Sequence, residues 1–192
     1  MIVFHLLILV SWLTPIAYWA VQAGRVKSNV RGKWQWRREI GLRLAILVLV
    51  VLALRVPGVH HQLQTVRRYV ANTNLTAGYC GAALCACGVI LAIWARACLG
   101  RNWGIPMAEK ASPDLVTAGP YSHIRHPIYA GIILAILGSA IGQSILWVIP
   151  LVIVVPYFVF SARREEKLMS EKFPRQYPAY MDRSNMLIPF LF

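Results

Sequence analysis

Three long apolar runs constrain this chain more than any other feature of its sequence. The runs Ile2–Val21, Ile40–Val56 and Tyr79–Cys98 each approach the roughly 20 apolar residues that a helix needs to cross about 30 Å of hydrocarbon. With 58% hydrophobic and 14% charged residues among 192, the chain is too apolar for a soluble domain of this length. The runs therefore predict spanning helices. Because the first run lacks a basic start and a small-residue cleavage site, we expect it to be retained rather than removed as a signal peptide.

The basic residues, which give a net charge of +13, lie mainly between and after the apolar runs. Lys and Arg number seven in Arg25–Arg43, three in Arg55–Arg68, four in Arg96–Arg125 and six in Arg163–Arg183. The positive-inside rule then places the first, third and fourth groups in the cytoplasm and the amino terminus outside. Lipid headgroups are the nearest anions to these groups, so we expect the bilayer as a partner and no nucleic acid.

The third run contains all four cysteines and a row of small residues. The cysteines form no CxxC pair, so we expect neither a disulfide nor a metal site. Small residues at i, i+4, i+7 and i+11 share one face of a helix, and such a face lets a second helix approach closely. This face consists of Gly81, Cys85, Gly88 and Ala92.

A short helical hairpin is predicted after a loop rich in glycine and proline. Pro127 suits the first turn of a helix, and apolar residues continue to Ile141, which is about 15 residues and short of a full span. The run Ile145–Phe160 follows after about three residues, so the two arms must be antiparallel. We expect the end of the first arm to be loosened by glycines and the second arm to be kinked by prolines. These residues are Gly138, Gly142, Pro150 and Pro156.

The remaining sequence predicts a cytoplasmic helix from Arg163 that breaks at Pro174 and Pro178. We therefore expect an all-α, polytopic membrane bundle of about five spanning helices in one domain, residues 1–192. Residues 1–98 would form three spanning helices, and residues 99–192 would form the loop, the hairpin and the carboxy-terminal segment.

Reactive side chains gather at the mouth of the hairpin, in the segment GPYSHIRHPIYAG at Gly119–Gly131. Free backbone N–H groups at a helix start favour an anion such as a ligand carboxylate. A simpler interpretation is that the histidines and the arginine contact headgroups and the tyrosines join an aromatic belt. A metal site at His123 and His126 is disfavoured because Pro127 opposes a helical conformation at His126.

A second cluster, Arg163–Glu166, begins where the hairpin returns. Closure of the hairpin would bring His126 and Glu165 together despite their separation in sequence. The alternative for this cluster is a solvated helix start with offsetting charges. No GxGxxG, GxxxxGK[ST] or GxSxG sequence is present, so the usual dinucleotide, P-loop and serine-hydrolase motifs are absent.

In order, the motifs are LGRNWG (Leu99–Gly104), RHPIYAG (Arg125–Gly131), the pair Glu165-Glu166 and FPRQYPAYMDR (Phe173–Arg183). This combination resembles the isoprenylcysteine carboxyl methyltransferase and phospholipid methyltransferase superfamily. The resemblance runs from about Leu99 to Pro189 and leaves the first two helices without a signature. It implies S-adenosylmethionine as cofactor, a lipid-like acceptor that enters from the bilayer, and residues 99–192 as the catalytic part.

The resemblance also assigns roles to individual residues. Glu165 or Glu166 would hold the α-amino group of the cofactor, and a carboxylate suits an ammonium group. The expected contacts to the acceptor are Arg163, Arg164 and Tyr180. The remaining lining of the cofactor site would be Leu115, Val116, Tyr121, His126, Pro127 and Tyr129.

Substrate assignment stays open at this point. The carboxyl methyltransferases are expected to carry a substrate-binding arginine one turn before the leading glutamate, where this chain has Ser161. Both an isoprenylcysteine-type carboxylate and a phospholipid amine remain candidate acceptors, and the oligomeric state is open. The hairpin is also similar to that of membrane sterol reductases that use NADPH, and a non-enzymatic membrane protein is the third alternative.

Overall fold

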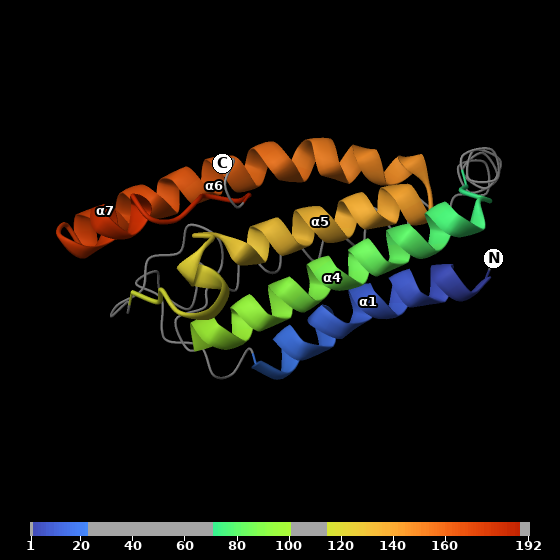
Figure 1. Ribbon diagram of the computed structural model, residues 1–192, viewed down its shortest axis with the longest axis horizontal. Helices are drawn as coiled ribbons and strands as arrows, with labels where there is room; N and C mark the ends of the chain where they lie inside the picture. The colour runs from blue at the N-terminus through green and yellow to red at the C-terminus, as the bar shows by residue number, and fades with distance from the viewer. Residues whose placement is uncertain (1, 23–70, 101–114, 189–192) are drawn as a thin grey trace, which may run out of the picture.

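The computed structural model describes residues 2–22, 71–100 and 115–188, and in these ranges the chain is helical (Figure 1). The predicted span Ile40–Val56 lies outside the described residues. Only isolated β-bridges accompany the helices in the described ranges, so the all-α prediction is confirmed. The elements are α1 (Ile2–Gln22), α4 (Leu75–Leu99), η3 (Gly119–Ser122), α5 (Pro127–Gly142), η4 (Ile145–Trp147), α6 (Val148–Lys172) and α7 (Gln176–Met181).

Three described helical segments are long and apolar enough to cross a membrane. They are Val3–Gln22, Leu75–Leu99 and Ile145–Lys172, while Pro127–Gly142 is a shorter apolar helix. The first and third predicted spans are thereby confirmed. The helix expected from Arg163 is present as the last turns of α6, which continues without a break to Lys172. No helix-breaking residue stands between Phe160 and Lys172, so the second arm of the hairpin carries the acidic pair directly into its own last turns.

The helices place all described catalytic candidates at one end of the bundle. In Figure 1, α1 and α4 run in the same direction, α5 returns antiparallel to α4, and α6 runs back beside α5. The ends of α1 and α4, the start of α5 and the end of α6 therefore lie together. At the opposite end, the backbone N–H of Asn72 donates to Gln143 O at 2.9 Å.

Helices α4 and α5 pack backbone to backbone along small residues. A Cβ added to Gly81 would lie 2.2 Å from Gly142 N, and one added to Gly88 would lie 2.5 Å from both Ala135 N and Gly131 O. The predicted face of α4 is thus confirmed as a contact face. It meets a face of α5 with the same spacing, formed by Gly131, Ala135, Gly138 and Gly142.

The expected loosening of α5 by its glycines is wrong. A Cβ on Gly138 would lie 2.4 Å from Cys85 N, so this glycine permits one of the closest approaches between the two helices. In a membrane, where lipid is as apolar as leucine, such close packing is a main source of helix association.

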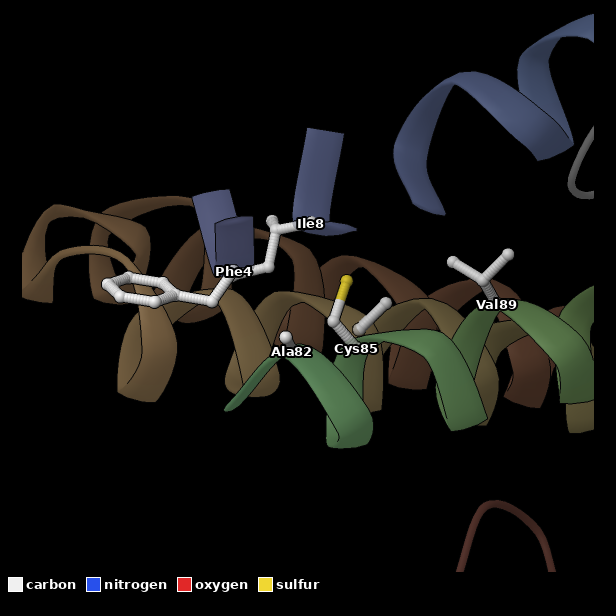
Figure 2. Close-up of a cluster of buried hydrophobic side chains, with 6 residues drawn as sticks. Phe4, Ile8, Ala82, Cys85 and Val89 are labelled. Carbon is white, nitrogen blue, oxygen red and sulfur yellow. The ribbon is translucent and has the colours of Figure 1, made fainter. Parts of the chain in front are cut away.

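Helix α1 covers the first half of α4. Figure 2 shows Phe4 and Ile8 of α1 beside Ala82, Cys85 and Val89 of α4, and all five side chains are buried. A polar contact joins this cluster to α5, because Trp12 Nε1 donates to Ser139 Oγ at 3.0 Å.

The prolines act differently from the sequence-based expectation. Pro150 and Pro178 occupy the first turns of α6 and α7, where their missing N–H groups cost no intrahelical hydrogen bond. The kink expected at Pro150 and the break expected at Pro178 are therefore wrong. Pro156 does lie in the interior of α6, and the chain ends α6 before Pro174 as expected.

Candidate functional site

The segment that leads into α5 places His126 at the helix entrance. η3 is followed by an isolated parallel bridge between Ile124 and Asn185, and Pro127 is the first residue of α5. His126 has φ −124° and ψ 60°, outside the helical region, as expected for a residue before proline. Its side chain is 8% exposed and turns inward. His123, in contrast, is exposed, and its Nδ1 lies 2.7 Å from Ser122 Oγ.

Both members of the acidic pair lie beside His126. His126 Nδ1 is 3.6 Å from Glu165 Oε2, and His126 Nε2 is 3.4 Å from Glu166 Oε1. These residues stand about 40 positions apart in sequence, and closure of the α5–α6 hairpin brings them together. The predicted convergence of His126 and Glu165 is therefore observed. A solvated helix start does not describe Glu166, whose side chain is 8% exposed.

An aromatic wall closes one side of this cluster. The ring of Tyr129 stacks on His126 with centroids 5.5 Å apart, and on Phe158 with centroids 4.4 Å apart. The Tyr129 hydroxyl donates a short hydrogen bond to Glu165 Oε1. Leu187 packs against the same group from the carboxy-terminal segment. The stack offers flat apolar surface next to charged groups, which suits a ligand that is aromatic at one end and polar at the other.

Arg125 is a member of this cluster that its sequence context did not predict. It was grouped with possible headgroup contacts, but its Nε donates to Glu166 Oε1 at 2.5 Å. The same guanidinium donates to Met181 O at 3.2 Å and to Ser184 O. Its adjacency to His126 was the available signal, because a residue next to a buried one at a helix entrance can itself be buried.

The carboxy-terminal segment is fastened across the entrance of α5. Arg125 N donates to Asn185 O at 2.8 Å, His126 N to Met186 O at 3.1 Å, and Asn185 N to His123 O at 3.0 Å. This ladder fixes the segment that carries Leu187 against the aromatic wall. The site is thus built from three separate stretches of sequence.

Buried tyrosines complete the connection between α7 and η3. Tyr180 is 3% exposed, and its hydroxyl donates to Tyr121 O at 2.6 Å. Burial raises the pKa of Tyr180 to about 12, and burial also raises the pKa values of Tyr121 and Tyr177. All three hydroxyls are therefore protonated at neutral pH, as the hydrogen bond donated by Tyr180 requires.

Several predicted site residues are not joined to the cluster by the described contacts. Leu115 and Val116 are half-buried in the loop before η3, and no described hydrogen bond links them to His126. Arg163 and Arg164 are exposed on α6 and form no ion pair with another described residue. Their position one turn or less before the acids keeps them at the edge of the site.

The cluster has the chemistry to hold a zwitterionic ligand. Glu165, with a side chain 29% exposed, is the more accessible acid and matches an ammonium group, while Glu166 is engaged by Arg125. His126 Nε2 is buried and, apart from the approach of Glu166 Oε1 to 3.4 Å, has no polar contact of hydrogen-bond geometry among the described residues. Within the described residues, no three or more His, Cys, Asp or Glu side chains are arranged so that they could hold a metal ion.

The comparison with known proteins agrees with this placement. A family model described as phospholipid methyltransferase matches residues 76–176, which include α4, the hairpin and the acidic pair. That family belongs to the isoprenylcysteine carboxyl methyltransferase-like superfamily. The chain is also 28% identical over 162 residues to the nickel-cobalt-cadmium resistance protein NccN of Alcaligenes xylosoxydans xylosoxydans. The alignment covers 78% of this chain and 67% of that protein.

Proposed function

We propose, from the premise that this chain belongs to the phospholipid methyltransferase family, that it transfers a methyl group from S-adenosylmethionine to a lipid-like or membrane-embedded acceptor. The family match supports a membrane methyltransferase, and the described apolar helices agree with an integral membrane protein. The observation that carries the proposal is the convergence of His126, Tyr129 and Glu165 at the mouth of the hairpin. We place this mouth on the cytoplasmic side, following the distribution of basic residues.

Different residues of the site would bind different parts of the cofactor. Glu165 holds the α-amino group, because its side chain is 29% exposed and can be reached by a ligand, whereas that of Glu166 is 8% exposed. The start of α5 and His126 Nε2 face the polar end, and Tyr129 with Phe158 offers apolar surface. Tyr121 and Pro127 shape the entrance. Leu115 and Val116, which remain predicted lining residues, precede it.

The cofactor would supply an electrophilic methyl group. In the transfer, the acceptor forms a new bond to the methyl carbon while the S–C bond breaks and its electron pair stays on sulfur. The protein therefore has to align the acceptor with the methyl group and exclude water. The buried aromatic wall and the fastened carboxy-terminal segment serve both purposes. We propose that Arg163 and Arg164, which are exposed at the edge of the site, contact anionic groups of the acceptor. Tyr180 would hold η3 in place beside the acceptor through the hydrogen bond from its hydroxyl to Tyr121 O.

Glu165→Gln tests the cofactor assignment. Loss of the carboxylate removes a charge-assisted hydrogen bond to the ammonium group, which corresponds to roughly 10- to 100-fold weaker binding of S-adenosylmethionine. Calorimetry on the detergent-solubilised protein measures this affinity. His126→Ala should also weaken binding.

The control is Glu171→Gln, which changes an exposed acid on the same helix and should leave affinity within about twofold. Titration with NADPH runs in parallel. Binding of NADPH without S-adenosylmethionine would point to a reductase, and binding of neither would leave the cluster a structural one. Equal losses of affinity and of folding yield in Glu165→Gln would also refute the assignment.

A further inference from the structure

Ser161 carries a buried hydroxyl that the fold does not use. Its side chain is 0% exposed, and its Oγ has no hydrogen-bond partner among the described residues. Leaving a buried hydroxyl without a partner costs stability, because the group has lost water and gained nothing in exchange. An alanine would fill this place without that cost, as Ala162 does next to it.

Four other serine and threonine hydroxyls in the described helices avoid this cost in the same way. Each donates to the backbone carbonyl four residues earlier, at 2.8 to 2.9 Å, as is usual for serine and threonine in apolar helices. For Ser161 that acceptor would be Tyr157 O, and the bond is not formed. The residues that do form it are Ser11, Thr14, Ser139 and Ser170.

The position of Ser161 relates it to the candidate site. Phe158, Ser161 and Glu165 stand at i, i+3 and i+7 and so share one face of α6. Phe158 stacks on the ring of Tyr129, and Glu165 accepts a hydrogen bond from the Tyr129 hydroxyl. Ser161 therefore lies between the two contacts that hold Tyr129 against α6.

Depth along α6 separates Ser161 from the polar end of the site. Four residues of helix place it about 6 Å from Glu165, toward the apolar part of the spanning segment. If Glu165 holds the amino group of the cofactor, Ser161 lies one helical turn deeper toward the bilayer, where a lipid-like acceptor would meet the methyl group. Ser161 is neutral and fully buried, whereas Arg163 and Arg164 are exposed at the edge of the site. The face that Ser161 shares with Phe158 and Glu165 therefore offers no positive charge to an anion.

Resting on the proposed function, we infer that Ser161 is an acceptor-contacting residue whose hydroxyl hydrogen-bonds an uncharged group at the reacting end of the acceptor. An uncharged amine meets this requirement. Its nitrogen lone pair forms the new C–N bond as the S–C bond breaks, the electron pair of that bond stays on sulfur, and the surplus N–H proton is released to water. The Ser161 hydroxyl orients the nitrogen and does not enter the bond changes.

Ser161→Ala tests this inference through two effects of opposite sign. In the ligand-free protein the variant should raise the midpoint of thermal unfolding by roughly 2–4 °C, because it removes a buried group without a partner. It should lower kcat/KM for the acceptor roughly 5- to 10-fold, and leave the Kd of S-adenosylmethionine within about twofold. Methyl transfer is followed from labelled cofactor to phosphatidylethanolamine in vesicles and, separately, to micellar N-acetyl-S-farnesylcysteine.

Two serine-to-alanine variants serve as controls. Ser139 is equally buried but donates to Ala135 O and accepts from Trp12, so Ser139→Ala should lower the midpoint. Ser170 lies on α6 beyond the acids, and Ser170→Ala removes a hydroxyl that already has a partner. Neither the rise in midpoint nor the loss of transfer expected for Ser161→Ala should appear in this variant.

The results separate the inference from the function on which it rests. Failure of the wild-type protein to bind S-adenosylmethionine overturns the proposed function. With binding intact, the inference is overturned if Ser161→Ala lowers the midpoint as Ser139→Ala does, if it transfers methyl groups as fast as the wild type, or if the label goes to the farnesylcysteine carboxylate. The midpoint comparison needs no acceptor, so a fall in the midpoint overturns the inference even where neither probe is methylated.

Discussion

Arg125 joins three parts of the site, so Arg125→Ala has an effect whose size can be worked from the structure. The substitution removes the 2.5 Å ion pair with Glu166 and the bonds to Met181 O and Ser184 O. The side chains of Arg125 and Glu166 are only 10% and 8% exposed, so Glu166 would be left as a buried charge with His126 as its remaining partner. Breaking one side of a buried pair costs about 3–5 kcal/mol.

The expected result is a fall of about 10 °C in the thermal midpoint of the detergent-solubilised protein, at about 2–4 °C per kcal/mol for a chain of this size. The carboxy-terminal segment should also become accessible to limited proteolysis after Met181, because two carbonyl contacts that hold it are gone. The thermal midpoint of Arg125→Lys should lie between those of the wild type and Arg125→Ala, because one ammonium group cannot replace a guanidinium that bonds to three acceptors.

Arg164→Ala provides the matched control, because this arginine is exposed on α6 and should change stability by no more than about 0.5 kcal/mol. A destabilisation of Arg125→Ala as small as that of Arg164→Ala would refute the reasoning. So would unchanged proteolysis of the carboxy-terminal segment despite a large loss of stability, because the contacts to Met181 and Ser184 would then not be what fastens it.

Two further outcomes follow from the packing and from the buried tyrosines. Gly138→Ala should lower the midpoint and the yield of folded protein, because its Cβ would lie 2.4 Å from Cys85 N and the helices would have to separate; an unchanged midpoint would contradict the close packing. For Tyr180, burial raises the pKa from 10 to about 12, so its contribution to stability is complete below pH 10 and is lost as the pH rises toward 12. Unfolding measured between pH 9 and 12 should show a smaller decline in Tyr180→Phe than in the wild type, and equal declines would assign the effect to other groups.

Much of the fold follows from local properties of the sequence. Apolar length predicts the spans of α1 and α4, and Pro127 with the short connection at 142–147 predicts the hairpin. A short connection forces the two arms to run antiparallel, so the approach of the segments around His126 and Glu165 could be predicted without a structure. The face of small residues on α4 could also be predicted, because helical periodicity is a property of one segment alone.

Only the tertiary structure decides which groups face each other. The sequence offered Glu165 and Glu166 as equivalents, and only the position of Arg125 engages Glu166 and leaves Glu165 as the more accessible acid. The glycines of α5 pack against α4, which the sequence of α5 alone does not indicate, and only the tertiary structure shows that the Ser161 hydroxyl has no hydrogen-bond partner in the described part of the chain. The physical reason is that periodicity and helix breakers act within a segment, whereas hydrogen bonding and close packing depend on the neighbour that folding supplies.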